Sequence, residues 1–280
     1  MFLPDEFEVN REKTCRNQDI VNVLDIVVEV RDFINKLGFL ASGKDFLMLN
    51  AVGVINGNII LNSAAKTMES IRYCCMNSNF ADAYTLLRKL RDDLFYYVYL
   101  FAVADQSDFT KLAYTDELNK DEKNVWNWVH NQQKNLHIGT VLKCIASNSY
   151  AKEAVEKFNL KDSFDKLADK LNNYVHSNGY LFYNESLDRL AMTKKTKEMC
   201  NEFSETVIFV TVTFLFLVVL IRPLLIMSDD YTDYLEFNDT PPKNSQYWVA
   251  PFVSDFLCKY KRILDENCEK YLREKTGMQI

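Results

Sequence analysis

Apolar side chains recur at spacings of three and four residues along much of the chain, a pattern typical of amphipathic helices. The first apolar stripe consists of Ile20, Val23, Leu24, Val27, Val30, Ile34 and Leu37. A second helix is expected over 60–76, and the polar sequence 77–79 reads as a turn and a helix cap. A long helix is then expected over 80–104. Its buried side would carry Leu87, Leu90, Leu94, Val98 and Phe101.

Proline and glycine support this assignment. The five prolines are Pro4, Pro223, Pro241, Pro242 and Pro251, so residues 5–222 contain none. Because proline costs about 3 kcal/mol inside a helix, such a span permits long helices. Four of the seven glycines are Gly38, Gly43, Gly53 and Gly57. Their clustering predicts a small irregular or hairpin insertion near residues 38–58, with the hairpin around 46–55.

The remaining pattern completes an all-α prediction. Short helices are expected over 123–135 and 140–147, followed by a helix over 161–178 that Gly179 would end. The sequence therefore predicts a helical bundle whose antiparallel neighbours are joined by short loops. Residues 1–227 are expected to form the bundle core. Residues 228–280 are expected to form a C-terminal linker and an amphipathic helix.

The segment 206–221 contains sixteen residues and no charged side chain. Extended to 227, it reaches the length of about 20 residues that a membrane span requires. Lysines at 194, 195 and 197 precede it and aspartates at 229 and 230 follow it, so a span would leave the N-terminal bulk in the cytoplasm. The alternative is a buried core helix, apolar on all sides. The short apolar run and its three threonines favour this core helix.

Composition narrows the functional classes. The chain is 48% hydrophobic and 26% charged, with a net charge of −6, which is typical of a globular protein without a general attraction to nucleic acid. Its seven cysteines include no Cys-x-x-Cys, so we expect free thiols in a reducing compartment and no zinc site. The acidic N-terminus lacks the apolar run of a signal peptide. We therefore expect a cytoplasmic protein or, if 206–227 spans, a single-pass inner-membrane protein with its N-terminal domain in the cytoplasm.

His176 is the most informative polar residue. In the expected helix, Leu160, Phe164, Leu167 and Leu171 share one face, while His176 projects from another. It also falls in the last turn, where the helix dipole favours a protonated imidazole. His176 could therefore act as a general acid or base, or it could simply cap the helix.

A second polar cluster lies on the long helix and consists of Arg88, Lys89, Arg91, Asp92 and Asp93. Arg88 and Asp92 are four residues apart, so they can pair on the helix surface. The pair could be a solvated salt bridge or the rim of a pocket. His130 and His137 lack a third ligand nearby and make a poor metal site, and no phosphate-binding glycine loop is present. No metal or cofactor is expected.

Two short motifs carry a resemblance. The sequences Arg88-Lys-Leu-Arg91-Asp92 and Asn173-Tyr-Val-His176-Ser-Asn178-Gly179-Tyr180 together resemble a group of uncharacterised bacterial helical proteins. That group is in turn similar to HEPN-like domains, found in RNases of toxin–antitoxin and phage-defence systems. The resemblance covers about 58–183. The resemblance implies an arginine, a polar residue after it, and a histidine four to six residues further on. Here Lys170 stands in the place of the arginine, with Asn173 as the polar residue and His176 as the histidine.

Two functions follow as hypotheses. The first is a helical interaction or effector module of a bacterial system, which binds a protein partner or forms a homo-oligomer. RNA is an alternative partner, and a membrane is another, contacted through 206–227. The second is a metal-independent endoribonuclease, in which His176 is the acid or base and Arg88 or Lys170 neutralises phosphate. Lysine offers only a point charge where arginine offers a rigid fork, and this favours the first function. Under either function, we expect His176 to lie in contact with Arg88 or Asp92, in a polar pocket between the helix over 80–104 and the helix over 161–178.

Overall fold

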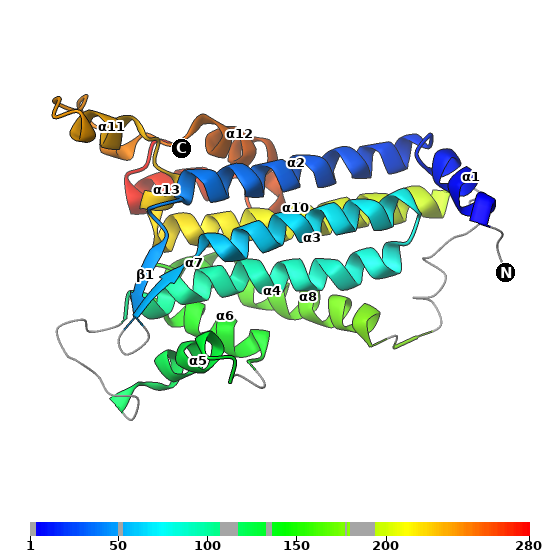
Figure 1. Ribbon diagram of the computed structural model, residues 1–280, viewed down its shortest axis with the longest axis horizontal. Helices are drawn as coiled ribbons and strands as arrows, with labels where there is room; N and C mark the ends of the chain where they lie inside the picture. The colour runs from blue at the N-terminus through cyan, green and yellow to red at the C-terminus, as the bar shows by residue number, and fades with distance from the viewer. Residues whose placement is uncertain (1–3, 50–52, 107–116, 133–135, 177, 180–193) are drawn as a thin grey trace.

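The computed structural model describes residues 4–49, 53–106, 117–132, 136–176, 178–179 and 194–280. Long helices lie side by side and form the body of the molecule (Figure 1). They are α2 (Gln18–Ala41), α3 (Asn58–Met76), α4 (Phe80–Ala104), α8 (Leu160–Val175) and α10 (Lys194–Ile221). The shorter helices are α1 (Pro4–Thr14), α5 (Lys120–Val129), α6 (Ile138–Ser147) and α7 (Lys152–Lys157). The predicted all-α bundle is confirmed.

Polar caps set the start of two long helices. The Asn17 side chain accepts the backbone N–H groups of Asp19 and Ile20 at 2.9 and 3.2 Å, which fixes the beginning of α2. The Asn79 side chain accepts the N–H of Asp82 at 3.2 Å and begins α4 at the predicted position. The short strands β1 (Phe46–Leu49) and β2 (Gly53–Asn56) pair antiparallel, so the predicted hairpin insertion is also confirmed.

Helix α10 occupies the centre of the bundle. Residues Thr196–Ile221 are long and apolar enough to cross a membrane, yet 83% of the most apolar window is buried inside the protein. Phe203 packs edge-to-face against Phe80 and Tyr84, with ring centroids 5.4 and 4.9 Å apart. Within the described chain, α10 therefore serves as a core helix surrounded by other helices, the alternative that the three threonines favoured.

Three predicted boundaries are wrong. The apolar helix of 206–227 ends at Ile221, because a residue before proline is disfavoured in α conformation and Arg222 precedes Pro223 with φ −142° and ψ 68°. The helix expected over 123–135 is α5, which begins earlier because Asn119 and Glu122 form a capping box. Helix α8 ends at Val175, before the glycine that was expected to end it.

The C-terminal residues form α11 (Asp230–Glu236), η3 (Ser245–Tyr247), α12 (Pro251–Tyr260), η4 (Lys261–Ile263) and α13 (Cys268–Thr276), after the short turn η2 (Pro223–Ile226). Phe256 of α12 stacks on Phe33 of α2 at 4.0 Å, and Tyr271 of α13 lies 6.1 Å from Phe216 of α10. Both helices thus join the main core. Helix α11 differs, since none of its residues is buried.

Candidate functional site

The middle of α4 carries the charged cluster that the sequence singled out. Arg91 is 2% exposed, and its Nε and Nη2 donate to Oδ1 of Asp92 at 2.9 and 2.6 Å. Arg88 lies on the other side of Asp92, with Nε 3.9 Å from Oδ2. The predicted pairing of Arg88 with Asp92 is therefore present but loose, and the stronger partner of Asp92 is its sequence neighbour Arg91.

Asp93 points to a different face of α4. Its carboxylate forms an ion pair with Lys89, and the Lys89 ammonium also donates to Ser63 at 3.3 Å and Thr67 at 3.2 Å on α3. Burial raises the pKa of Asp93, while the Lys89 hydrogen bond opposes that rise. Asp93 is consequently a carboxylate held at the edge of the protein interior.

Two adjoining hollows open beside Asp93, between α3, α4, β2 and the short helices α5 and α6. Their volumes are about 290 and 790 Å³, and they share Ile60, Asp93 and Trp128. We call them together the α4 groove. Its other lining residues are Asp92, Tyr96, Leu136, Ile138 and Val141 in the smaller hollow, and Val54, Ile55, Asn56, Ile59, Ser63, Val129 and Asn131 in the larger.

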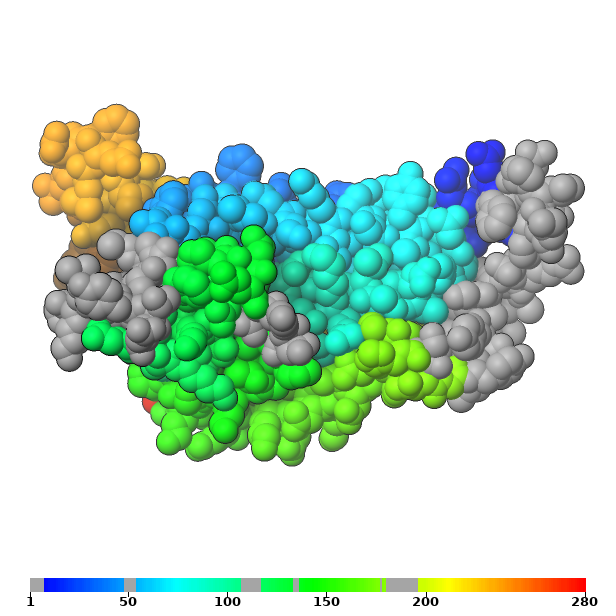
Figure 2. Space-filling model, turned by 60° about the horizontal axis from the view of Figure 1, so that its bottom comes forward, coloured from blue at the N-terminus to red at the C-terminus, as the bar shows by residue number. Residues whose placement is uncertain are grey.

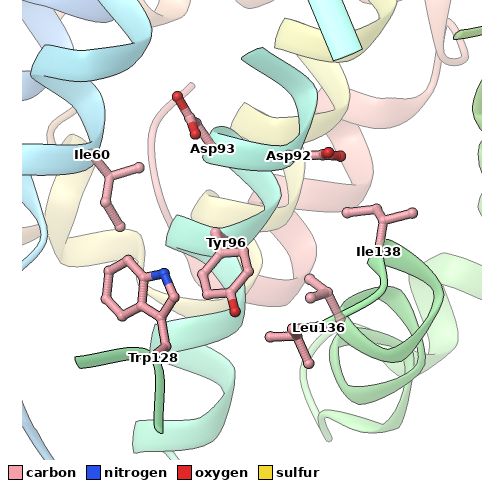
Figure 3. A pocket seen from close by; sticks show the side chains of 8 residues that line it. Ile60, Asp92, Asp93, Tyr96, Trp128, Leu136 and Ile138 are labelled. Carbon is pink, nitrogen blue, oxygen red and sulfur yellow. The ribbon is translucent and has the colours of Figure 1, made fainter. Parts of the chain in front are cut away.

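Aromatic side chains form the wall of the smaller hollow. The Tyr96 and Trp128 rings lie 5.3 Å apart, and Figure 3 shows Tyr96 between Trp128 on one side and Leu136 on the other. The Tyr96 hydroxyl is buried and makes no hydrogen bond within the described chain, and burial raises its pKa. The wall therefore presents apolar surface together with one unpaired hydroxyl and the nearby carboxylates of Asp92 and Asp93.

The hairpin supports the outer wall of the groove. The Gly57 N–H donates to the backbone carbonyl of Asp45 at 3.1 Å and closes the hairpin base. The Asp45 side chain is fully buried, neither carboxyl oxygen has a hydrogen-bond partner among the described residues, and burial raises its pKa to about 6. The Tyr97 ring packs on Gly57 so closely that a Cβ there would lie 2.8 Å from Cε2.

His176 does not join this site. Tyr174 stacks on Tyr84 at 4.2 Å, and Phe164 packs edge-to-face on Phe95 at 4.9 Å, so α8 runs antiparallel to α4. This register places His176 opposite the start of α4, about 9 Å along the helix axis from Arg88 and about 15 Å from Asp92. This register separates His176 from Asp92, and the predicted contact of His176 with Arg88 stays a prediction.

The His176 side chain is exposed, and His176 occupies the C-cap of α8. Its backbone N–H bonds to the carbonyl of Asn172 at 3.0 Å, so the cap is made by the main chain. Asn173 is tied to Asn178, whose N–H donates to its carbonyl at 3.0 Å. The motif residues Ser177 and Tyr180 lie outside the described residues.

Lys170, the residue in the arginine position of the resemblance, is tied to α10. Its ammonium pairs with Glu202 at 2.8 Å, donates to Thr206 at 3.1 Å, and lies 4.7 Å from the centre of the Tyr84 ring. These contacts join α8, α10 and α4. Lys170 thus has a structural role in the bundle, and its ammonium is held by α10.

The sequence interpretation missed Tyr96, Trp128, Ile59 and the other apolar residues of the α4 groove. One signal was available, because Asn119 and Glu122 follow the capping-box pattern that starts α5 and so orients Trp128. Within the described residues, no group of three or more histidine, cysteine or acidic side chains could hold a metal ion. Burial raises the pKa of the Cys144 and Cys200 thiols to about 12, so they are poor nucleophiles.

Comparison with known proteins gives no assignment. No family model matches the chain. No curated protein and no solved structure matches it either.

Proposed function

We propose that the protein is a helical interaction module and that the α4 groove binds a segment of a partner protein. The observation that supports this proposal is the exposed apolar rim of the groove. Val54 and Ile59 are 63% and 68% exposed, and they continue directly into the aromatic wall of Tyr96 and Trp128. An exposed apolar patch beside a hollow is typical of an interaction site.

The lining of the groove also favours an extended occupant. Val54, Ile55 and Asn56 are consecutive in β2, and all three border the larger hollow. Successive side chains of a strand point to opposite faces, so consecutive lining residues mean that the edge of the strand faces the hollow. Since β2 pairs only with β1 in the described hairpin, a partner segment could add to its open edge and place an apolar side chain near Trp128.

An effector role in bacterial defence extends this proposal, and its support is the resemblance carried by Arg88–Asp92 and the turn around His176. RNA cleavage by His176 is the weaker candidate, because the Lys170 ammonium is engaged with Glu202 and Thr206. The interaction function needs neither residue.

The test compares variants of the full chain in quantitative affinity purification from the native cells. Ile59→Asp places a charge on the rim, at the N-terminal end of α3 where the helix dipole tolerates an acid. Tyr73→Asp makes the same change at another exposed position of α3, about 20 Å further along the helix. We expect Ile59→Asp to reduce a specific partner about tenfold or more, and Tyr73→Asp to leave it unchanged. Equal recovery with both variants would contradict the proposal.

A further inference from the structure

The chain leaves the bundle after Met227 and returns to it at Trp248. The Ser228 N–H donates to the Trp248 carbonyl at 2.9 Å, and the Ala250 N–H donates to the Ile226 carbonyl at 3.0 Å. Both ends of the excursion are therefore held together by main-chain hydrogen bonds. The segment between them projects from one end of the molecule, drawn in orange in Figures 1 and 2.

Inside the excursion, α11 displays apolar side chains to solvent. Tyr234 is 40% exposed and Leu235 is 50% exposed, and Phe237, the residue after the helix, is 77% exposed. The following turns are tight, because Asn238 and Asn244 adopt left-handed backbone angles with φ +56° and +66°. The salt bridge between Lys44 and Asp229 fixes the base of α11 to the segment after α2. The apolar side chains are thus presented on an anchored projection.

The charged side chains of α11 and of the residues beside it have one sign. Residues 228–239 contain no lysine or arginine, and their acids are Asp229, Asp230, Asp233, Glu236 and Asp239. At about 100° per residue, Asp230, Asp233 and Glu236 share one side of α11. Tyr231, Tyr234 and Leu235 share the other side. A partner that covers the apolar side would therefore meet acids along its border.

We propose that α11 is a docking element that inserts Tyr234 and Leu235 into an apolar pocket with a lysine- or arginine-rich rim on another protein. Charge complementarity selects this occupant. Anionic membranes and nucleic acids would be repelled by the carboxylates of Asp230, Asp233, Glu236 and Asp239. A second copy of this chain is also disfavoured, since each copy carries a net charge of −6.

The proposal is tested by photocrosslinking in the native cells. The full chain carries Leu235→p-benzoylphenylalanine, alone or together with Asp230→Asn, Asp233→Asn and Glu236→Gln. None of these positions is buried, so circular dichroism and the melting temperature should match the unmodified chain. Mass spectrometry then identifies the crosslinked residues. A third sample adds Ile59→Asp, so that a failure of the α4 groove is distinguished from a failure of α11.

We expect one crosslinked protein, joined at an apolar site flanked by lysine or arginine. The neutralised variant should lower its yield about tenfold, and the addition of Ile59→Asp should leave it unchanged. Three results would overturn the proposal. They are a crosslink between two copies of this chain, a crosslink that survives neutralisation, and the absence of any crosslink above the background of the unirradiated sample.

Discussion

The turn at the end of α8 and the α4 groove both contain polar side chains that could carry function, but their surroundings are opposite. His176 is exposed, and its cap is formed by the main chain. Asp93 and Tyr96 instead lie beside a hollow walled by aromatic and aliphatic side chains. A short motif identifies residue types, whereas the packing of helices decides which of them share a cavity. The difference predicts that substitutions beneath the groove affect stability strongly and that substitutions at the turn do not.

The largest effect is expected from Asp45. Its folded-state pKa of about 6 lies above its ordinary value of 3.8, so the folded protein binds more protons than the unfolded chain between these pH values. The contribution of Asp45 to the free energy of unfolding is therefore complete below pH 4 and is lost as the pH rises through 6. This loss amounts to about 3 kcal/mol. Urea unfolding is measured across this pH range for the protein and for Asp45→Asn. The fall in unfolding free energy with rising pH that Asp45 causes should be seen in the unsubstituted protein and be missing from Asp45→Asn. Parallel pH profiles of unfolding free energy for the two proteins would contradict the claim that burial raises the pKa of Asp45.

Gly57→Ala should have the next largest effect. The new Cβ would lie 2.8 Å from the Tyr97 ring and 3.3 Å from the Asp45 carbonyl, so ring or hairpin must move. We expect a loss of about 2 kcal/mol, measured by urea unfolding. Gly139→Ala is the control, since nothing lies within 4 Å of its added Cβ. If both variants were equally stable, the hairpin would not be anchored as described.

The two arginines next to Asp92 should differ in how much each contributes to stability. Arg91→Ala removes a buried guanidinium that makes two hydrogen bonds to Asp92, and we expect a cost of about 2 kcal/mol. Arg88→Ala removes a loose ion pair at 3.9 Å and should cost less than about 1 kcal/mol. Melting temperatures of both variants test the order, and a larger loss for Arg88→Ala would reverse the assignment of the principal partner.

His176→Ala should have the smallest effect. Because the side chain is exposed, the expected change is within about 0.5 kcal/mol. The variant should also keep the partner that the Ile59→Asp variant loses. A change in RNA levels or in toxicity with His176→Ala, at unchanged stability, would restore the ribonuclease hypothesis.

Local sequence signals predicted the elements better than they predicted the site. The span 80–104 was correct because an Asn79 cap and a continuous apolar stripe both lie within the helix itself. The meeting of His176 with Arg88 required the register between α4 and α8, which the rings of Tyr84 and Tyr174 set only after the helices pack. The groove depends in the same way on how α5 and α6 rest against α4. Its lining residues come from separate segments with no common motif.

Contact mapping at the two regions tests the central claim most directly. In the native cells, full-length chains carry either Ile59→p-benzoylphenylalanine or His176→p-benzoylphenylalanine, both at exposed positions. The account predicts that position 59 crosslinks to a partner protein, and that position 176 crosslinks neither to that partner nor to RNA. A crosslink to RNA from position 176, with none to protein from position 59, would contradict it.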